Sequence, residues 1–192
     1  MKPATTLLTL ATAAMLWGCG TSNSTDSTEA ADSANEAMAD SAGTTAATAV
    51  AEEDAKFAVD AADGGMAEVA LGELAQNKGT DPKVKEFGKM MVTDHTKAND
   101  ELKALAAGKN ITLPAVPSED KQKVETDLSA KSGKDFDKAY IDQMVDDHQK
   151  TVKLFEDGQK NVKDVEIKAF IDKTLPVLRS HLDHIKSLDK AK

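Results

Sequence analysis

The chain has 192 residues, a net charge of −9 and a single cysteine. An acidic chain without a basic patch is a poor candidate for nucleic-acid binding, because that binding depends on clustered Lys and Arg. One cysteine also excludes an intramolecular disulfide framework, so any fold must be stabilised by a hydrophobic core.

Residues 1–18 have the pattern of a secretory signal. Lys2 precedes an apolar stretch that is too short to span a bilayer. The stretch ends in Leu16-Trp17-Gly18-Cys19, which resembles the lipobox that directs lipidation of a cysteine and cleavage before it. The alternative is an ordinary signal with a cysteine there by chance. We expect a bacterial envelope lipoprotein whose acylated Cys19 is anchored in membrane lipid, at the outer membrane and facing the periplasm.

Residues 20–50 consist mainly of Ser, Thr, Ala and acidic residues, with no Lys or Arg. They offer little apolar surface to bury, so no burial would offset the backbone entropy lost on ordering them. The sequence predicts that residues 19–50 form a lipidated, disordered tether with a span of roughly 30 Å. The tether would hold a folded domain, residues 51–192, clear of the membrane.

From about Glu52 onward, apolar residues recur with a helical period, and no segment alternates as a strand would. Gly79, Gly108 and Gly158 mark expected helix ends, and Asp81-Pro82 supplies an N-cap and a first-turn proline. The long helices are expected at 52–78, 82–107, 135–157 and 164–189, the last with Pro176 as a kink.

The segment between the second and third long helices is too long for a simple turn. Residues 110–117 contain two prolines and should be extended, and a short helix should follow from Ser118 to about Ala130. A long connection favours parallel second and third helices. The sequence therefore predicts an all-α fold, a ferritin-like four-helix bundle with a long crossover.

Heptad steps place all four histidines and one glutamate on inward helix faces. The motif Met91-Val-Thr-Asp94-His95 recurs as Met144-Val-Asp-Asp147-His148 in the third long helix. In a crossover bundle these two histidines should lie at one level. His181 and Glu68 fall within about 6 Å of that level at ~1.5 Å per residue, and His184 follows on the same expected stripe.

The stretch Gly65-Met-Ala-Glu68-Val-Ala-Leu71-Gly72, the motif ending in Asp94-His95, and Leu175-Pro176…His181 together resemble a known family. This is the bacterial envelope family catalogued as domain of unknown function 4142. The resemblance covers nearly all of residues 52–190. It implies a ferritin-like bundle and an exported location, and it implies no established activity.

A di-iron carboxylate centre is disfavoured, because such bundles need Glu-x-x-His on two helices, and none is present. A mononuclear copper or zinc site fits better. Its candidate ligands are His95, His148, His181 and Glu68, with His184, Met91 and Met144 as further candidates, and Asp94 and Asp147 as buried polar support. The alternative is a buried network in which each histidine pairs with a carboxylate or a carbonyl.

Three functional classes remain open from the sequence. The first is a non-enzymatic envelope module, including a structural or stress-related protein that acts through a partner. The second is a lipoprotein that binds or buffers one copper or zinc ion. The third, an enzyme, is least favoured, because no nucleophile–base set or phosphate loop is recognisable.

Overall fold

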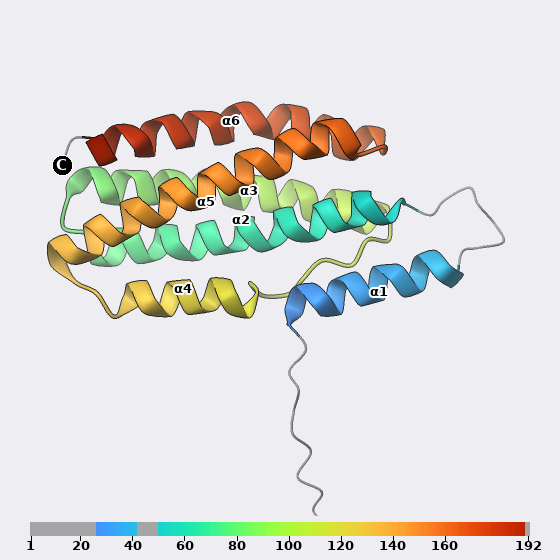
Figure 1. Cartoon of the computed structure of the whole chain (residues 1–192), viewed down its shortest axis with the longest axis horizontal. Coiled ribbons are helices and arrows are strands. Elements are labelled where there is room, and N and C mark those ends of the chain that lie inside the picture. The colour runs from blue at the N-terminus through green and yellow to red at the C-terminus, as the bar shows by residue number, and fades with distance from the viewer. Residues whose placement is uncertain (1–25, 42–49, 191–192) are drawn as a thin grey trace, which may run out of the picture.

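The computed structural model describes residues 26–41 and 50–190 (Figure 1). It contains six helices: α1 (Ser27–Ser41), α2 (Glu52–Lys78), α3 (Pro82–Gly108), α4 (Glu119–Ser129), α5 (Gly133–Asn161) and α6 (Val165–Lys190). No strand occurs in these residues. Within them, no helix has the length and apolar character needed to cross a membrane. The expected signal and Cys19 lie outside the described residues.

The four long helices form two antiparallel hairpins, α2–α3 and α5–α6, which pack as one bundle. After α3, residues 109–118 run back along the outside of the bundle and continue into α4, which packs on α2 and α5 (Figure 1). As a result α3 and α5 run in the same direction. This confirms the all-α, ferritin-like fold with a crossover, including the helical break before Ser118.

The two hairpins are tied together at both ends by buried aspartates. Asp54, near the start of α2, accepts hydrogen bonds from the backbone N–H groups of Lys163 and Asp164 at 2.9 and 2.8 Å, in the turn between α5 and α6. Asp137, near the start of α5, accepts from the N–H groups of Thr80 and Asp81, both at 2.9 Å, in the turn between α2 and α3. Each hairpin therefore fixes the other hairpin's turn, and this sets the relative level of their helices.

Two glycines allow α2 and α3 to approach closely. A Cβ at Gly72 would lie 2.7 Å from the carbonyl oxygen of Gly88, and a Cβ at Gly88 would lie 2.7 Å from that of Gly72. No real Cβ contact is that short, so the two backbones touch here. This contact lies one turn before Met91 and two turns before His95.

The expectation that Gly158 ends the third long helix is wrong, because α5 continues to Asn161. Gly158 is buried, and a Cβ there would lie 2.9 Å from the ring of Phe57. The glycine therefore makes room for an aromatic ring from α2, and its role is in packing rather than in helix termination.

The expectation of a disordered tether is wrong for residues 27–41, which form α1. This helix is held by polar side chains rather than by an apolar stripe. Ser27 donates to the carbonyl of Val116 at 2.8 Å, and the Asn35 amide exchanges two hydrogen bonds with the backbone of Thr112, at 3.0 and 2.7 Å. The partners lie about 80 residues away in the crossing segment, which is why composition alone did not reveal them. Residues 19–25 and 42–49 of the expected tether lie outside the described residues.

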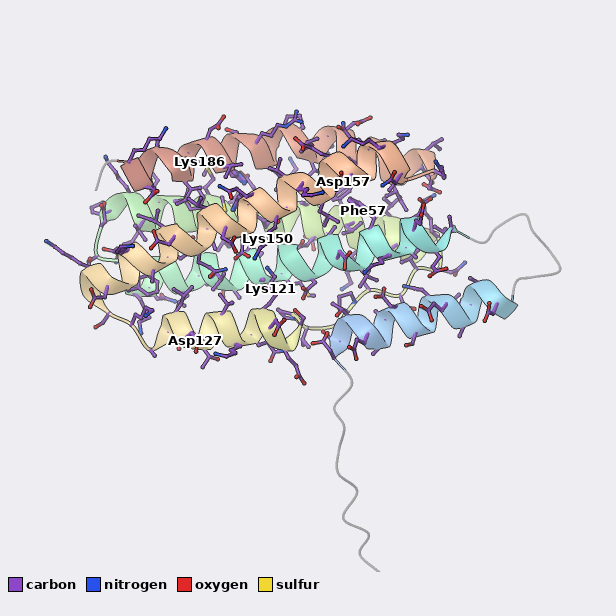
Figure 2. All side chains as sticks on the ribbon, viewed as in Figure 1. Phe57, Lys121, Asp127, Lys150, Asp157 and Lys186 are labelled. Atoms are coloured by element: carbon purple, nitrogen blue, oxygen red, sulfur yellow. The ribbon has the colours of Figure 1, made fainter. Side chains whose placement is uncertain are left out.

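Charged side chains cover the outside of the bundle (Figure 2). Several form i,i+4 pairs along one helix, such as Lys150 with Asp146 at 2.6 Å. Pairs of this kind are solvated and contribute little to stability. Most of the polar residues expected to form a site are instead buried inside the bundle.

Candidate metal centre

Three histidines from three helices meet at the middle of the bundle. His95 of α3, His148 of α5 and His181 of α6 are 6%, 0% and 3% exposed. Their ring centroids are 5.5 to 5.8 Å apart, and one nitrogen of each ring lies within 4.8 Å of the others. The convergence expected from the parallel α3 and α5 helices is therefore confirmed.

The histidines form a polar layer between two apolar cores. One core includes Phe57, Leu102 and Phe155, and the other includes Phe87, Met91 and Met144. Each long helix contributes one buried polar residue at the level of this layer, and that residue lies between the positions that the helix contributes to the two cores. These residues are Glu68, His95, His148 and His181. Burying a polar layer at this depth is unfavourable unless its atoms find partners.

Hydrogen bonds fix two of the rings and leave one nitrogen of each free. His148 donates its Nδ1–H to the carbonyl of Met144 at 2.9 Å, since a carbonyl can only accept. His181 donates its Nε2–H to the Asp94 carboxylate at 2.9 Å. The opposite nitrogens, His148 Nε2 and His181 Nδ1, are buried without a partner among the described residues, and so is His95 Nε2. An unsatisfied buried polar atom costs about 1–3 kcal/mol, so three such nitrogens in one layer make it a candidate site for a bound ion.

Burial also holds the rings in their neutral form. Burial, with a smaller contribution from the neighbouring His148 and His181, lowers the pKa of His95 to about 3. Burial lowers the pKa of His148 to about 4, and it lowers the pKa of His181 although Asp94 opposes the shift. At neutral pH each ring therefore carries a lone pair, and the neutral imidazole is the form that binds metal ions.

Glu68 of α2 borders this layer but does not belong to the nitrogen cluster. Its Oε1 lies 3.3 Å from His148 Nδ1, the nitrogen that already donates to a carbonyl. Burial raises the pKa of Glu68 well above its usual value, and the negative charge of Asp147 raises it further. Among the described residues, the group able to hold an ion consists of three imidazoles and no carboxylate.

Two residues near the site, Tyr140 and Lys121, were not predicted from the sequence. Tyr140 is fully buried, its hydroxyl has no partner among the described residues, and burial followed by the charge of Glu68 raises its pKa. It lies four residues before Met144 and eight before His148, so an i,i+4 step from Met144 could have identified it, whereas the heptad step back from His148 leads to Ile141. Lys121, on the surface helix α4, had no comparable sequence signal.

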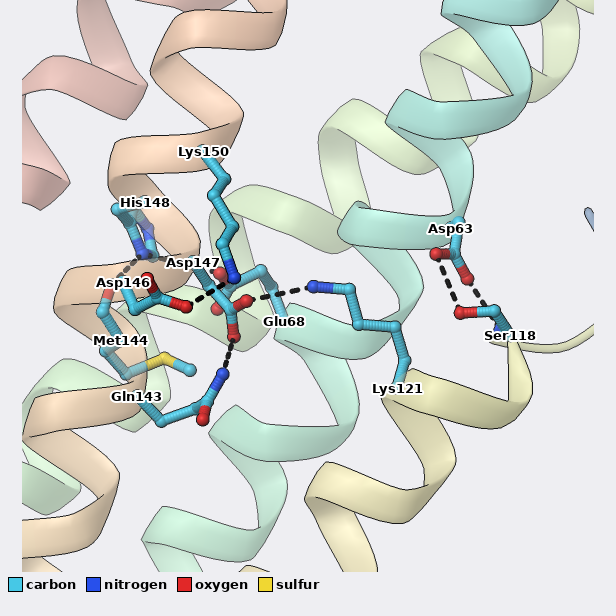
Figure 3. Close-up of polar contacts among 10 residues, drawn as sticks. All are labelled: Asp63, Glu68, Ser118, Lys121, Gln143, Met144, Asp146, Asp147, His148 and Lys150. Atoms are coloured by element: carbon cyan, nitrogen blue, oxygen red, sulfur yellow. Dashed lines mark hydrogen bonds and ion pairs between the residues drawn. The ribbon is translucent and has the colours of Figure 1, made fainter.

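The two aspartates expected to support the site have different roles. Asp94 contacts a histidine directly, as described above, but the expectation that it is buried is wrong, because its side chain is 39% exposed. Asp147 accepts from Lys121 of α4 and from Gln143, both at 2.9 Å, and this places α4 over α2 and α5 (Figure 3). Asp147 therefore anchors the crossover, and it makes no hydrogen bond to a histidine.

The remaining candidate ligands, two methionines and one histidine, differ in burial. Met91 and Met144 are fully buried in the core next to the histidine layer. The expectation that His184 faces inward is wrong: it is exposed, and its ring contacts Phe87 at a centroid distance of 5.5 Å. The inward face of α6 carries Ile185 instead of His184, because the more apolar residue occupies the core.

A family profile described as a domain of unknown function, DUF4142, matches residues 39–188. No curated protein matches the chain. Among solved structures, a DUF305 fragment from Deinococcus radiodurans is similar with a TM-score of 0.66 and 9% identity, covering 74% of this chain and 99% of that one. CopM in its Cu(II)-bound form is similar with a TM-score of 0.62 and 17% identity, and in its Cu(I)-bound form with a TM-score of 0.61 and 16% identity. Both matches cover 72% of this chain and 96% of that one. At these identities the likeness shows a shared fold.

Proposed function

The chain belongs to the family described as a domain of unknown function, DUF4142, and we propose that it binds one copper ion between His95, His148 and His181. The observation that carries the proposal is the set of three buried, neutral imidazoles, each with an unpartnered nitrogen. The ligand nitrogens would be His95 Nε2, His148 Nε2 and His181 Nδ1. The carbonyl of Met144 and the carboxylate of Asp94 would orient the rings, as outer partners commonly do at metal sites.

The charge of the site favours the monovalent ion, Cu(I). The cost of transferring an ion into a buried site rises with the square of its charge, and the three imidazoles carry no negative charge to offset it. Cu(II) and Zn²⁺ would therefore be penalised more than Cu(I). Imidazole suits copper, and Met91 and Met144 add soft thioether groups one turn before His95 and His148 on the same helix faces. CopM, which shares the fold, has solved structures in Cu(I)-, Cu(II)- and silver-bound forms.

The competing interpretation is a purely structural hydrogen-bond network. It accounts for one nitrogen of His148 and one of His181, which pair with Met144 and Asp94. It leaves His95 Nε2, His148 Nε2 and His181 Nδ1 unsatisfied. A bound ion accounts for all three, so we favour the metal site.

We further propose that the protein is a non-enzymatic copper-buffering lipoprotein of the bacterial envelope, with acylated Cys19 anchored in the outer membrane facing the periplasm. The lipobox-like segment Leu16–Cys19 supports this location. Replacing Cys19 with Ser should release the protein from membrane fractions or leave it unprocessed. Normal maturation with unchanged membrane retention would contradict the anchor.

Anaerobic titration of the purified chain with Cu(I), in competition with the chromophoric chelator bicinchoninate, tests the binding function. We expect one Cu(I) per chain in the unmodified protein and loss of this binding in His95→Ala and His148→Ala. His184→Ala is the matched control, because this exposed histidine lies outside the cluster, and it should bind normally. Unchanged binding in both cluster variants, or tighter binding of Zn²⁺ than of Cu(I), would contradict the proposal.

A further inference from the structure

We propose that a surface pocket between α3 and α6 is the port through which the copper ion enters and leaves the buried site, and that Asp94 is the residue that receives it. The pocket has a volume of about 110 Å³, and its lining comprises Asp94, Lys97, Ala98, Glu101, Lys173, Thr174 and Val177. The inference rests on the proposed copper binding and adds the route of the ion.

The histidine layer is closed along the axis of the bundle. Phe87, which is fully buried, contacts the rings of His148 and His181 at centroid distances of 6.0 and 6.5 Å. On the opposite side, Leu175 and Leu178 of α6 are 1% and 2% exposed and belong to the other apolar core. An ion that moved along the axis would have to cross an apolar core without ligands, which is strongly unfavourable.

The side of the layer next to α2 is also covered. Glu68 is 3% exposed there, and Lys121 of α4 reaches across to Asp147 (Figure 3). The side chain of Asp147 is 5% exposed. Of the two remaining described helices, α1 packs on α2, and α4 packs on α2 and α5, rather than on the side where α3 faces α6.

Asp94 connects the buried site with solvent on that side. Its side chain is 39% exposed, yet its Oδ2 lies 2.9 Å from the Nε2 of the buried His181. It lines one part of the pocket, and an ion pair between Glu101 and Lys173, 2.5 Å apart, borders another part. One carboxylate thus touches both the pocket and a ligand of the proposed site.

The size of the pocket suits a small cation, and its charged lining is balanced, with Asp94 and Glu101 against Lys97 and Lys173. A water molecule occupies about 30 Å³ in the liquid, so the pocket accommodates an ion with a few waters. The Asp94 carboxylate can replace one of those waters and attract the cation. Because Asp94 binds the Nε2–H of His181, the lone pair on Nδ1 remains available, and the ion can pass to the histidines without breaking that hydrogen bond.

Filling the pocket tests the port. Val177 is 42% exposed at its rim, so Val177→Phe adds bulk there at little cost to the core. The control is Val165→Phe, which makes the same change at a position on α6 that is 78% exposed and outside the pocket. Stopped-flow measurement of Cu(I) transfer to and from bicinchoninate should show uptake and release both slowed at least tenfold by Val177→Phe. The dissociation constant should change less than threefold, and Val165→Phe should behave as the unmodified protein.

A second pocket-filling variant is available in case the first does not fold, and a third variant tests Asp94. Thr174→Met fills the same pocket, so it replaces Val177→Phe if thermal melting shows that variant to be unfolded. Asp94→Asn keeps an oxygen that can accept from His181 but removes the charge. It should slow uptake and remove the ionic-strength dependence of the uptake rate, whereas Asp100→Asn, an equal charge loss on the exposed face of α3, should not.

The outcomes separate this inference from the proposed function. If the unmodified protein binds no Cu(I), both are overturned. If it binds Cu(I) and the pocket-filling variants exchange the ion at the unmodified rate, only the port is overturned. A large change in affinity with an unchanged uptake rate would likewise overturn the port, because it would show that the pocket residues only support the site.

Discussion

His181 and Asp94 are joined across the bundle by a 2.9 Å hydrogen bond, and Asp94 is the immediate neighbour of His95 in sequence. Adjacent residues on a helix point about 100° apart, so the Asp94-His95 dipeptide performs two separate tasks. His95 faces the interior as a proposed ligand. Asp94 faces α6 and orients a ligand that the other hairpin supplies.

Truncating this outer partner should weaken copper binding. Asp94→Ala removes the acceptor for His181 Nε2–H, so we expect the affinity for Cu(I) to fall by about 10–100-fold, the usual cost of losing such a partner. Asp147→Ala is the comparison, because Asp147 contacts Lys121 and Gln143 instead of a histidine. It should lower the melting temperature while leaving Cu(I) affinity within a few-fold. Equal losses of affinity in chelator competition would show that Asp94 has no special role.

The metal-free protein should lose stability in acid through its buried histidines. Burial lowers the pKa of His148 to about 4, against about 6.5 in the unfolded chain, so between these values the unfolded chain binds more protons and the free energy of unfolding falls as pH falls. Glu68, whose pKa burial raises, contributes in the opposite direction: its stabilisation is lost as pH rises above the unfolded value of 4.5. The histidine contribution is isolated by comparing the pH dependence of unfolding between a histidine variant and the unmodified protein, because Glu68 is present in both.

The corresponding test is urea unfolding at pH 7 and at pH 5. Replacing His148 with Gln should remove about 2 kcal/mol of the pH dependence between these values. His184→Gln, at an exposed position, should leave the dependence unchanged. A His148→Gln protein with the unmodified pH dependence would show that this ring is not held neutral by burial.

The buried aspartates at the hairpin ends should be important for stability. Asp54→Asn places an amide N–H₂ against the backbone N–H groups of the opposite turn, so we expect a loss of about 2–3 kcal/mol, and the same for Asp137→Asn. Asp146→Asn is the control: Asp146 is exposed and pairs with Lys150 on the surface, and its loss should cost less than about 0.5 kcal/mol. Losses of equal size in denaturant titrations would rule out the reciprocal capping as a major contribution.

The contact between α2 and α3 predicts opposite effects for two identical substitutions. Gly72→Ala forces apart two backbones that touch, and we expect it to destabilise the protein by about 1–3 kcal/mol. Gly108→Ala, where a Cβ would meet nothing within 4 Å, should stabilise it by up to about 1 kcal/mol through helix propensity. Thermal melting of both variants distinguishes these signs, and stabilisation by Gly72→Ala would contradict the close contact.

Much of the fold could be predicted from local sequence signals. Gly79 and Asp81-Pro82 marked the turn between α2 and α3, and the heptad step placed His95 and His148 on inward faces. These features depend on residues within one or two turns of each other. The same step failed by one residue in α6, where it selected His184 instead of Ile185. A helix turns its most apolar face to the core, and the heptad register assumed for α6 did not follow that face.

The features that the sequence did not reveal depend on distant partners. Asp54 and Asp137 resemble ordinary surface acids until the opposite turn is placed against them. The docking of α1 depends on hydrogen bonds from Ser27 and Asn35 to the crossing segment. The orientation of His181 likewise depends on Asp94, which is 87 residues earlier in the chain.

The most direct test of the copper site is anomalous diffraction from crystals of the protein loaded with Cu(I) under anaerobic conditions, measured at the copper edge. We expect one strong peak inside the bundle, at bonding distance of about 2 Å from His95 Nε2, His148 Nε2 and His181 Nδ1. Copper bound only at surface residues, or an interior without a peak between the three rings, would contradict the proposed site.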